Sequence, residues 1–215
     1  LDALALGTTA NFAWLTCGGA NYVGTATEAG SAVAMITRSS RYVICDNIEA
    51  PRIADEEIAG LGFELRQFDW HAGGRDRIIS EIADGGATGA DISISGARVV
   101  ADEVDFLRQS LTAQEIERYR ALGRDAGECL AETCRAVSPG MTEHEIAGEM
   151  NHRLLARGIV PTVTLVAVDE RTLRYRHPLP TDARLRSNAM LITGARRGGL
   201  IVSTSRLVHF GPFPA

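Results

Sequence analysis

Residues Leu111–Gly158 read LTAQEIERYRALGRDAGECLAETCRAVSPGMTEHEIAGEMNHRLLARG, and they carry the main evidence for the fold class. It contains two capping boxes, in which a threonine side chain accepts a hydrogen bond from a helical N–H and a glutamate three residues later bonds back to the threonine. One box begins at Thr112 and the other at Thr142. Between them, Pro139 and Gly140 interrupt the helical pattern. The stretch therefore predicts two consecutive capped helices.

Apolar residues recur at helical spacing in both predicted helices. In the second helix, Ile146, Met150 and Leu154 lie on one face, and Gly158 is expected to end the helix. The first helix carries one longer apolar stripe, which comprises Ile116, Tyr119, Leu122, Ala126, Cys129, Leu130 and Thr133.

Strands are expected after the two helices. Thr162–Val168 is predicted as a strand, and Asp169-Glu170 as the turn or loop that follows it. Ala189–Thr193 and Leu200–Thr204 are two further predicted strands, joined by a turn at Gly198-Gly199.

The residues before the two helices alternate between strand-like and helix-like segments. Ser31–Thr37 and Arg41–Cys45 are short apolar runs separated by a serine turn, which predicts a β-hairpin. Gly62–Phe68 alternates apolar and polar residues as a half-buried strand does. Helices are predicted over Ala50–Ala59 and Arg75–Ala83. We therefore expect an α/β domain ahead of the two helices, with a domain boundary near Gln109.

Composition excludes several classes of protein. The 215 residues carry a net charge of −5 with acidic and basic residues interspersed, so a nucleic-acid partner is not expected. No apolar run is long enough to cross a bilayer, and we expect no membrane partner. The four cysteines form no Cys-x-x-Cys pair and are expected to be free thiols of a cytoplasmic protein.

The order of these segments resembles the pita-bread superfamily, which includes creatinase, prolidase and aminopeptidase P. The resemblance rests on the two capped helices and on two earlier segments, NFAWLTCGGANYV (residues 11–23) and NIEAPRIADEE (residues 47–57). It implies an α/β creatinase-type N-terminal domain with a mixed sheet over residues 1–109. An α+β domain over residues 110–215 would be the first half of a pita-bread domain, so we expect the chain to be an incomplete part of a longer protein.

The resemblance also implies where metal ligands would stand. In metal-dependent members, an aspartate lies two residues before a glycine, and a second aspartate follows eleven residues after the first. Aligned on Gly194 and Arg206, the segment ITGARRGGLIVSTSR places Ile192 and Ser203 at those two positions. Neither side chain supplies the anionic oxygen that a pair of divalent cations requires. We expect no metal site and no cofactor.

Creatinase has this fold without metals, and its catalytic histidine corresponds to His177 in the segment YRHPLPTD. Histidine is suited to acid–base catalysis near neutral pH, so His177 is the expected catalytic residue. Arg176, like Arg174, could bind a substrate carboxylate. Creatinase-like dimers bring the partner's N-terminal domain near the active site, so Asn21 and Tyr22 could line the site of a neighbour in a homodimer. Alternatively, His177 is a loop histidine bonded to a backbone carbonyl, and the arginines are merely solvated.

These residues lead to three functional hypotheses. The first is a creatinase-like or aminopeptidase P-like hydrolase of a C–N bond in a small amide or short peptide, independent of metal. The second is a non-catalytic pita-bread protein that binds such a molecule. The third is a metal-dependent aminopeptidase with ligands elsewhere in the sequence.

His209 and the hydroxyls of Ser203–Ser205 are expected to be ordinary strand residues.

Overall fold

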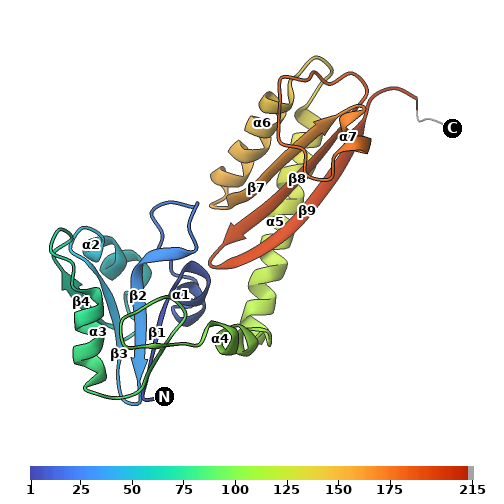
Figure 1. The fold of residues 1–215 in the computed structure, drawn as a ribbon. Coiled ribbons are helices and arrows are strands. Elements are labelled where there is room, and N and C mark those ends of the chain that lie inside the picture. The colour runs from blue at the N-terminus through green and yellow to red at the C-terminus, as the bar shows by residue number, and fades with distance from the viewer. Residues whose placement is uncertain (213–215) are drawn as a thin grey trace. The chain divides into compact units, whose positions relative to one another are not determined.

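The computed structural model describes residues 1–212. These residues form two compact units, of which the first spans Leu1–Leu111 and the second begins at Thr112 (Figure 1). Each unit encloses its own hydrophobic core. Each core is therefore assembled from one continuous half of the chain.

The first unit is built on a six-stranded mixed sheet, which confirms the predicted α/β class. In sheet order, the strands are β4 (Glu64–Phe68), β3 (Arg41–Asp46), β2 (Ala29–Thr37), β1 (Ala3–Thr8), β5 (Thr88–Ala90) and β6 (Arg98–Val99). The predicted hairpin is present as β2 and β3, with Ala34 opposite Val43. Strand β1 pairs antiparallel with β2, whereas β3–β4, β1–β5 and β5–β6 are parallel pairs.

Helices cover both faces of this sheet (Figure 1). They are α1 (Thr9–Leu15), α2 (Ala50–Arg52), the π-helical segment η1 (Ile53–Glu57), α3 (Arg75–Ala83) and α4 (Ala101–Arg108). On one face, Ile78 and Ile79 of α3 pack against the Val33 and Met35 side chains of β2. On the other face, Phe12 of α1 packs against Ala32 and Ala34 of β2. Strand β2 is therefore apolar on both faces, as a central strand requires.

The predicted helix over Ala50–Ala59 is shorter than expected and changes type. One turn of α-helix is followed by the wider π-helical turn of η1. This turn places the Glu57 carboxylate 2.9 Å from the Arg52 guanidinium and 2.6 Å from the N–H of Ala20. Ala20 is distant in the chain, and Arg52 lies five residues before Glu57 rather than the three or four of an α-helical pair, so α-helical periodicity could not predict either contact.

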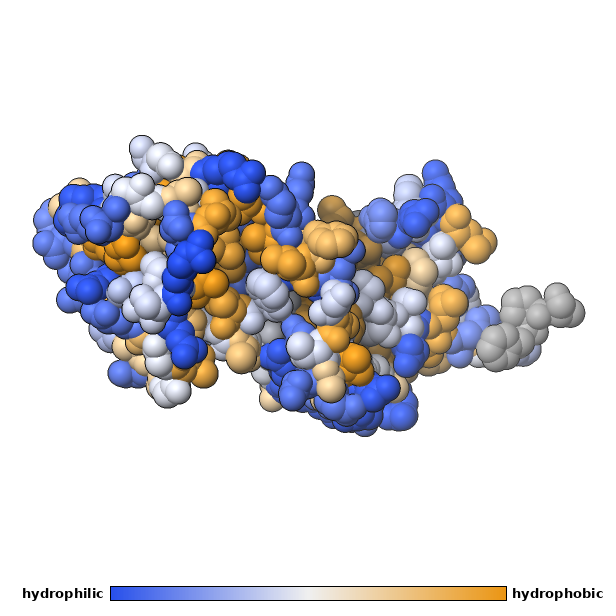
Figure 2. All heavy atoms as spheres, turned by 90° about the horizontal axis from the view of Figure 1, so that it is seen from below, coloured by the Kyte–Doolittle hydropathy of each residue, from blue (hydrophilic) through white to orange (hydrophobic). Residues whose placement is uncertain are grey.

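Both tryptophans of the chain lie in the first unit. Trp14 of α1 is partly buried against Leu6, Val100 and Val104. Trp70, which follows β4, is 62% exposed. Figure 2 shows one face of the molecule, on which apolar side chains interrupt the hydrophilic surface. Exposed apolar residues of the first unit also include Val23, Ile48, Val99, Phe106 and Leu107.

The second unit packs two helices on a three-stranded antiparallel sheet of order β7-β8-β9 (Figure 1). Its elements are α5 (Ala113–Ala136), α6 (Glu143–Ala156), β7 (Val160–Val168), α7 (Arg171–Arg174), β8 (Asn188–Arg197) and β9 (Leu200–His209). Both predicted capping boxes are formed, at Thr112 and Thr142. The predicted stripe of α5 is buried from Leu122 onward, whereas Ile116 near its start is 37% exposed. This unit has the predicted α+β architecture.

The face of the sheet turned away from α5 and α6 is uncovered over much of its area. Along β8, Leu191 and Ala195 join the core beneath the helices, so the alternate residues Met190 and Ile192 point outward. Leu207 of β9, directly opposite Met190, is 72% exposed. The three strands contain no aspartate or glutamate. The outward face therefore carries apolar side chains and hydroxyl groups. The strands that form it contain arginines but no acidic residue.

Within the described part of the chain, none of the helices has the length and apolar character needed to span a bilayer.

Candidate functional site

The loop that joins β7 to β8 carries the predicted catalytic residue. His177 and Arg176 lie near its middle, and both side chains are exposed. Neither side chain makes a hydrogen bond or an ion pair with any residue in the range 1–212. His177 and Arg176 are thus adjacent exposed residues of this loop, and their roles stay predictions.

The backbone beside His177 is anchored although its side chain is exposed. Pro178 is buried, and its carbonyl oxygen accepts a hydrogen bond of 3.2 Å from the N–H of Val166 in β7. One residue later, the carbonyl of Leu179 accepts a 3.0 Å bond from the Arg171 guanidinium. The imidazole thus projects into solvent from a fixed point of the loop.

Glu143, the first residue of α6, joins both ends of this loop. Its side chain is fully buried, and its carboxylate accepts four hydrogen bonds. One oxygen accepts from the N–H of Val168 (2.9 Å) and from Nε of Arg171 (2.8 Å). The other accepts from the N–H (2.8 Å) and hydroxyl (2.7 Å) of Thr181. A buried carboxylate is tolerated only with such complete pairing, so Glu143 holds the loop closed at its base.

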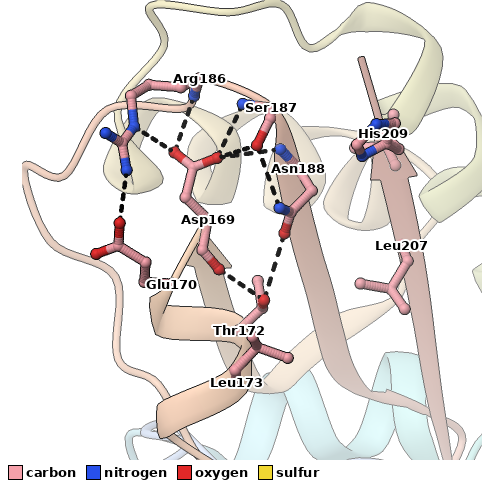
Figure 3. A pocket seen from close by; sticks show the side chains of 10 residues that line it. Asp169, Glu170, Thr172, Leu173, Arg186, Ser187, Asn188, Leu207 and His209 are labelled. Carbon is pink, nitrogen blue, oxygen red and sulfur yellow. Dashed lines mark hydrogen bonds and ion pairs between the residues drawn. The ribbon is translucent and has the colours of Figure 1, made fainter. Parts of the chain in front are cut away.

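Asp169 holds the start of the same loop against the start of β8 (Figure 3). It adopts the left-handed conformation with φ of 51°, which aspartate tolerates better than most residues. Its carboxylate accepts N–H bonds from Arg186 (3.0 Å), Ser187 (2.8 Å) and Asn188 (3.2 Å). Burial opposes ionisation of Asp169, but the hydrogen bonds from the backbone and hydroxyl of Ser187 and from its neighbours prevail and lower the pKa to about 2.

A pocket of about 580 Å³ lies beside Asp169, between α7 and the ends of β8 and β9 (Figure 3). Its apolar walls include Leu173 and Leu207, which are 91% and 72% exposed. Its polar groups are largely engaged with one another: the Thr172 hydroxyl bonds to the carbonyl of Asp169 and contacts the Asn188 amide oxygen. The pocket is therefore an apolar recess, and His177 is not among the residues that line it.

His209 lines this pocket, although the sequence indicated only an ordinary strand residue. Its Nε2 lies 2.9 Å from the carbonyl oxygen of Pro212. No local motif surrounds His209, so its place in the pocket follows only from the antiparallel pairing of Asn188 with His209.

Ile192 and Ser203 both lie on the outward face of the sheet. Ile192 is directly opposite Ser205, and Ser203 is opposite Gly194. A pair of divalent cations needs carboxylate oxygens, and the strands around these two positions contain none. Residues 1–212 contain no group of three or more His, Cys, Asp or Glu side chains placed to hold a metal ion. The side chains at positions 192 and 203 therefore do not supply the carboxylate ligands of a dinuclear metal centre.

Asn21 and Tyr22 lie in the first unit, at the start of an exposed segment. The Asn21 side chain is fully buried, and its amide donates to the carbonyls of Gly7 (3.2 Å) and Ala32 (2.7 Å). Asn21 therefore holds this segment against the sheet. Tyr22 is partly exposed, so it presents more surface to a ligand than Asn21 does.

Two features of this site were missed by reasoning from the sequence. Glu143 belongs to the motif Pro-Gly-Met-Thr-Glu, but an acidic residue at a helix start is most often a solvated one. Asp169 was expected only to form a turn. In both cases, the backbone N–H donors lie 17 to 38 positions away in the chain. A motif of a few neighbouring residues could therefore not reveal them.

Searches with the sequence match neither a protein-family model nor a curated protein. The structure, in contrast, is similar to several solved structures. It matches an X-Pro aminopeptidase from Thermotoga maritima with a TM-score of 0.74 and 20% identity, covering 99% of this chain and 63% of that one. It matches a prolidase from Pyrococcus horikoshii with a TM-score of 0.75 and 17% identity, covering 99% and 62%.

A third match is proline aminopeptidase P II from Yersinia pestis, with a TM-score of 0.67 and 14% identity, covering 96% of this chain and 58% of that one. At these identities the likeness shows the fold. The chain has the fold of the corresponding part of these peptidase structures, and it spans less than two thirds of the length of each.

Proposed function

We propose that this chain is part of a creatinase-like or aminopeptidase P-like hydrolase that cleaves a C–N bond in a small amide or short peptide. The reaction would proceed without a dinuclear metal centre, with His177 as acid and base and Arg176 as a substrate-binding residue. Two observations support the proposal. The fold is shared with X-Pro aminopeptidase and prolidase structures. The exposed imidazole of His177, which has no hydrogen-bond partner among residues 1–212, stands beside an anchored proline.

The single observation that carries the proposal is this exposed His177 imidazole on a fixed backbone. Histidine changes protonation state near neutral pH, so it can accept a proton from an attacking water and return it to the departing nitrogen. The base of the loop, held by Glu143, would keep the imidazole in one position relative to a bound amide.

Replacing His177 with Asn tests the role of this residue. In the whole natural protein, we expect His177→Asn to lower turnover about 10²- to 10⁴-fold, the usual contribution of a general acid–base group. The melting temperature should not change, because the imidazole makes no hydrogen bond with residues 1–212. His144→Asn is the matched control, since His144 is also exposed in the second unit. Unchanged turnover in the His177 variant would refute the proposed role.

The metal-independent part of the proposal follows from the side chains at positions 192 and 203. We expect the purified natural protein, incubated with Mn²⁺, Co²⁺ or Zn²⁺ and then desalted, to retain well under one metal ion per chain by elemental analysis. The physical reason is that Ile192 and Ser203 offer no anionic oxygen. Stoichiometric retention of a metal ion together with metal-dependent turnover would favour a metal-dependent aminopeptidase instead.

A second candidate function is a binding protein without catalysis. The neutral residues Ile192 and Ser203 favour it equally, because loss of catalysis would leave the same replacements. A panel of amides and dipeptides separates the two functions: a binding protein would show a higher melting temperature with a ligand but would form no product.

The proposed assembly in both cases is a homodimer, in which Tyr22 would lie near the site of the partner.

A further inference from the structure

A second pocket lies in the first unit, at the end of the hairpin formed by β2 and β3. Its volume is about 320 Å³, at the lower end of the range of roughly 300–1,000 Å³ that is usual for small-molecule sites. Leu15, Ile36 and Phe63 form its apolar wall, and the serine turn and Arg41 form its polar rim. We call this recess the hairpin pocket.

The apolar wall is the open end of the core beneath α1. Ala34 and Ile36 are successive residues on one face of β2, and Ala34 is fully buried whereas Ile36 is only partly buried. The seven residues of α1 rise about 10 Å, whereas the nine residues of β2 span about 30 Å. The helix ends at Leu15, so it leaves apolar surface accessible at this end of the hairpin.

Arg41 differs from the other arginines of the first unit. Residues 1–111 contain eight arginines. Seven of them form ion pairs with acidic residues of the same unit: Arg38, Arg52, Arg66, Arg75, Arg77, Arg98 and Arg108. Arg41 forms no ion pair with any residue in the range 1–212. Its guanidinium carbon instead lies 5.8 Å from the centre of the Phe63 ring, a contact that orients the cation and leaves its N–H groups free.

The serine turn adds hydroxyl groups to the same rim. The Thr37 hydroxyl is engaged within the turn, where it accepts a 3.1 Å hydrogen bond from the N–H of Ser40. The hydroxyls of Ser39 and Ser40 make no hydrogen bond with residues 1–212. The residues that line the pocket include no aspartate or glutamate, and the nearby Glu64 is paired with Arg66. The rim therefore offers an oriented cation and two hydroxyl donors to an anion.

We propose that the hairpin pocket binds a small aromatic carboxylate. Its carboxylate accepts hydrogen bonds from the planar fork of Arg41 and from the serine hydroxyls, and its ring lies on the apolar wall. One guanidinium matches the single charge of a carboxylate, whereas a phosphate group carries more negative charge than this rim can neutralise. The lining residues all belong to the first unit, so the proposal does not depend on the hydrolase function.

Benzoate is the probe for this site, with benzamide as its uncharged twin and acetate as the carboxylate without a ring. In the natural protein, benzoate should bind saturably and shift the amide NMR signals of Ser39, Ser40 and Phe63. Benzamide and acetate should each bind about tenfold more weakly or worse, because the first lacks the charge and the second lacks the apolar surface.

Substitutions of Arg41 test the cation. Arg41→Gln should weaken benzoate binding about tenfold, and Arg41→Lys, which keeps the charge but loses the planar fork, should bind with intermediate affinity. Arg38→Gln is the matched control and should bind as the natural protein does, because Arg38 lies in the same turn, pairs with Asp2 and does not line the pocket. Backbone amide spectra verify that each variant is folded.

Four results would overturn the proposal. The first is the absence of saturation up to about 10 mM benzoate, since even a weak site for a ligand of this size should fill in that range. The second is equal binding of benzamide or acetate and benzoate. The third is an equal loss of affinity in Arg38→Gln and Arg41→Gln. The fourth is tighter binding of phenyl phosphate than of benzoate, which would assign the pocket to a phosphate instead.

Discussion

Asp169 shows how a buried carboxylate can be more acidic than one in water. Its burial disfavours the charged form, but three consecutive backbone N–H groups, from Arg186 to Asn188, point at the two oxygens. Hydrogen bonds to the charged form outweigh the loss of hydration, and the pKa falls to about 2. The same bonds connect the end of β7 with the start of β8, so the ionisation of one residue and the path of the loop are coupled.

This coupling predicts a stability that depends on pH. Because the folded-state pKa of Asp169 is about 2 and the ordinary value is 3.8, the group stabilises the fold fully above pH 4 and loses this contribution as the pH falls toward 2. The contribution is about 2 kcal/mol. Asp169→Asn should lower the free energy of unfolding at pH 7 by about that amount, as measured by urea denaturation.

At pH 2.5 the difference between Asp169→Asn and the natural chain should be much smaller. Equal stability of the two proteins at pH 7 would contradict the predicted stabilisation of the fold by ionised Asp169. Asp182→Asn is the matched control, since Asp182 is exposed in the same loop and makes no ion pair within residues 1–212.

Glu143 joins α6 to the loop between β7 and β8, so we expect the helix and the loop to be restrained together. Glu143→Gln removes the charge that Arg171 requires and places an N–H₂ group where Thr181 now donates. We expect a loss of about 3 kcal/mol in unfolding free energy, as for breaking a buried charge pair. Trypsin should also cleave faster after Arg174 and Arg176, which mass spectrometry of the fragments can locate.

Glu149→Gln is the control on the same helix, because its exposed pair with Arg153 should matter little. If both variants are cleaved at the same rate, Glu143 does not restrain the loop.

The elements with a local signature could be predicted from the sequence. The capping boxes at Thr112 and Thr142 are formed, α3 has the predicted bounds Arg75–Ala83, and the hairpin of β2 and β3 turns at the predicted serines. In each case, the residues that determine the element lie within a few positions of one another, so their physical effect is visible in a short window.

The remaining elements depend on contacts between distant residues. Strand β1 pairs in parallel with β5, and Ala3 lies opposite Thr88, for which no local pattern exists. Strands β8 and β9 extend beyond their predicted ends because each supports the other along ten residues. At the site, the position of His177 in an exposed loop could be predicted, whereas the role of Glu143 could not, since its partners lie 25 to 38 residues away.

The first unit has the features of an independent folding domain. Its sheet is covered on both faces, and its cores draw only on residues 1–111. We expect residues 1–111, expressed alone, to give a dispersed NMR spectrum and one cooperative thermal transition. A second-unit fragment from Thr112 should be less soluble, because the outward face of its sheet exposes Leu207. A disordered 1–111 fragment would refute the independence of the first unit.

The position of the two tryptophans gives the chain a built-in optical label. Trp14 and Trp70 both belong to the first unit, and the second unit contains tyrosines but no tryptophan anywhere in its sequence. Selectively excited indole emission therefore reports the melting of residues 1–111 alone, whereas far-ultraviolet circular dichroism follows the helices of both halves. Comparing the two signals on an unmodified sample reveals whether the halves melt together or one after the other, without any dye or engineered probe.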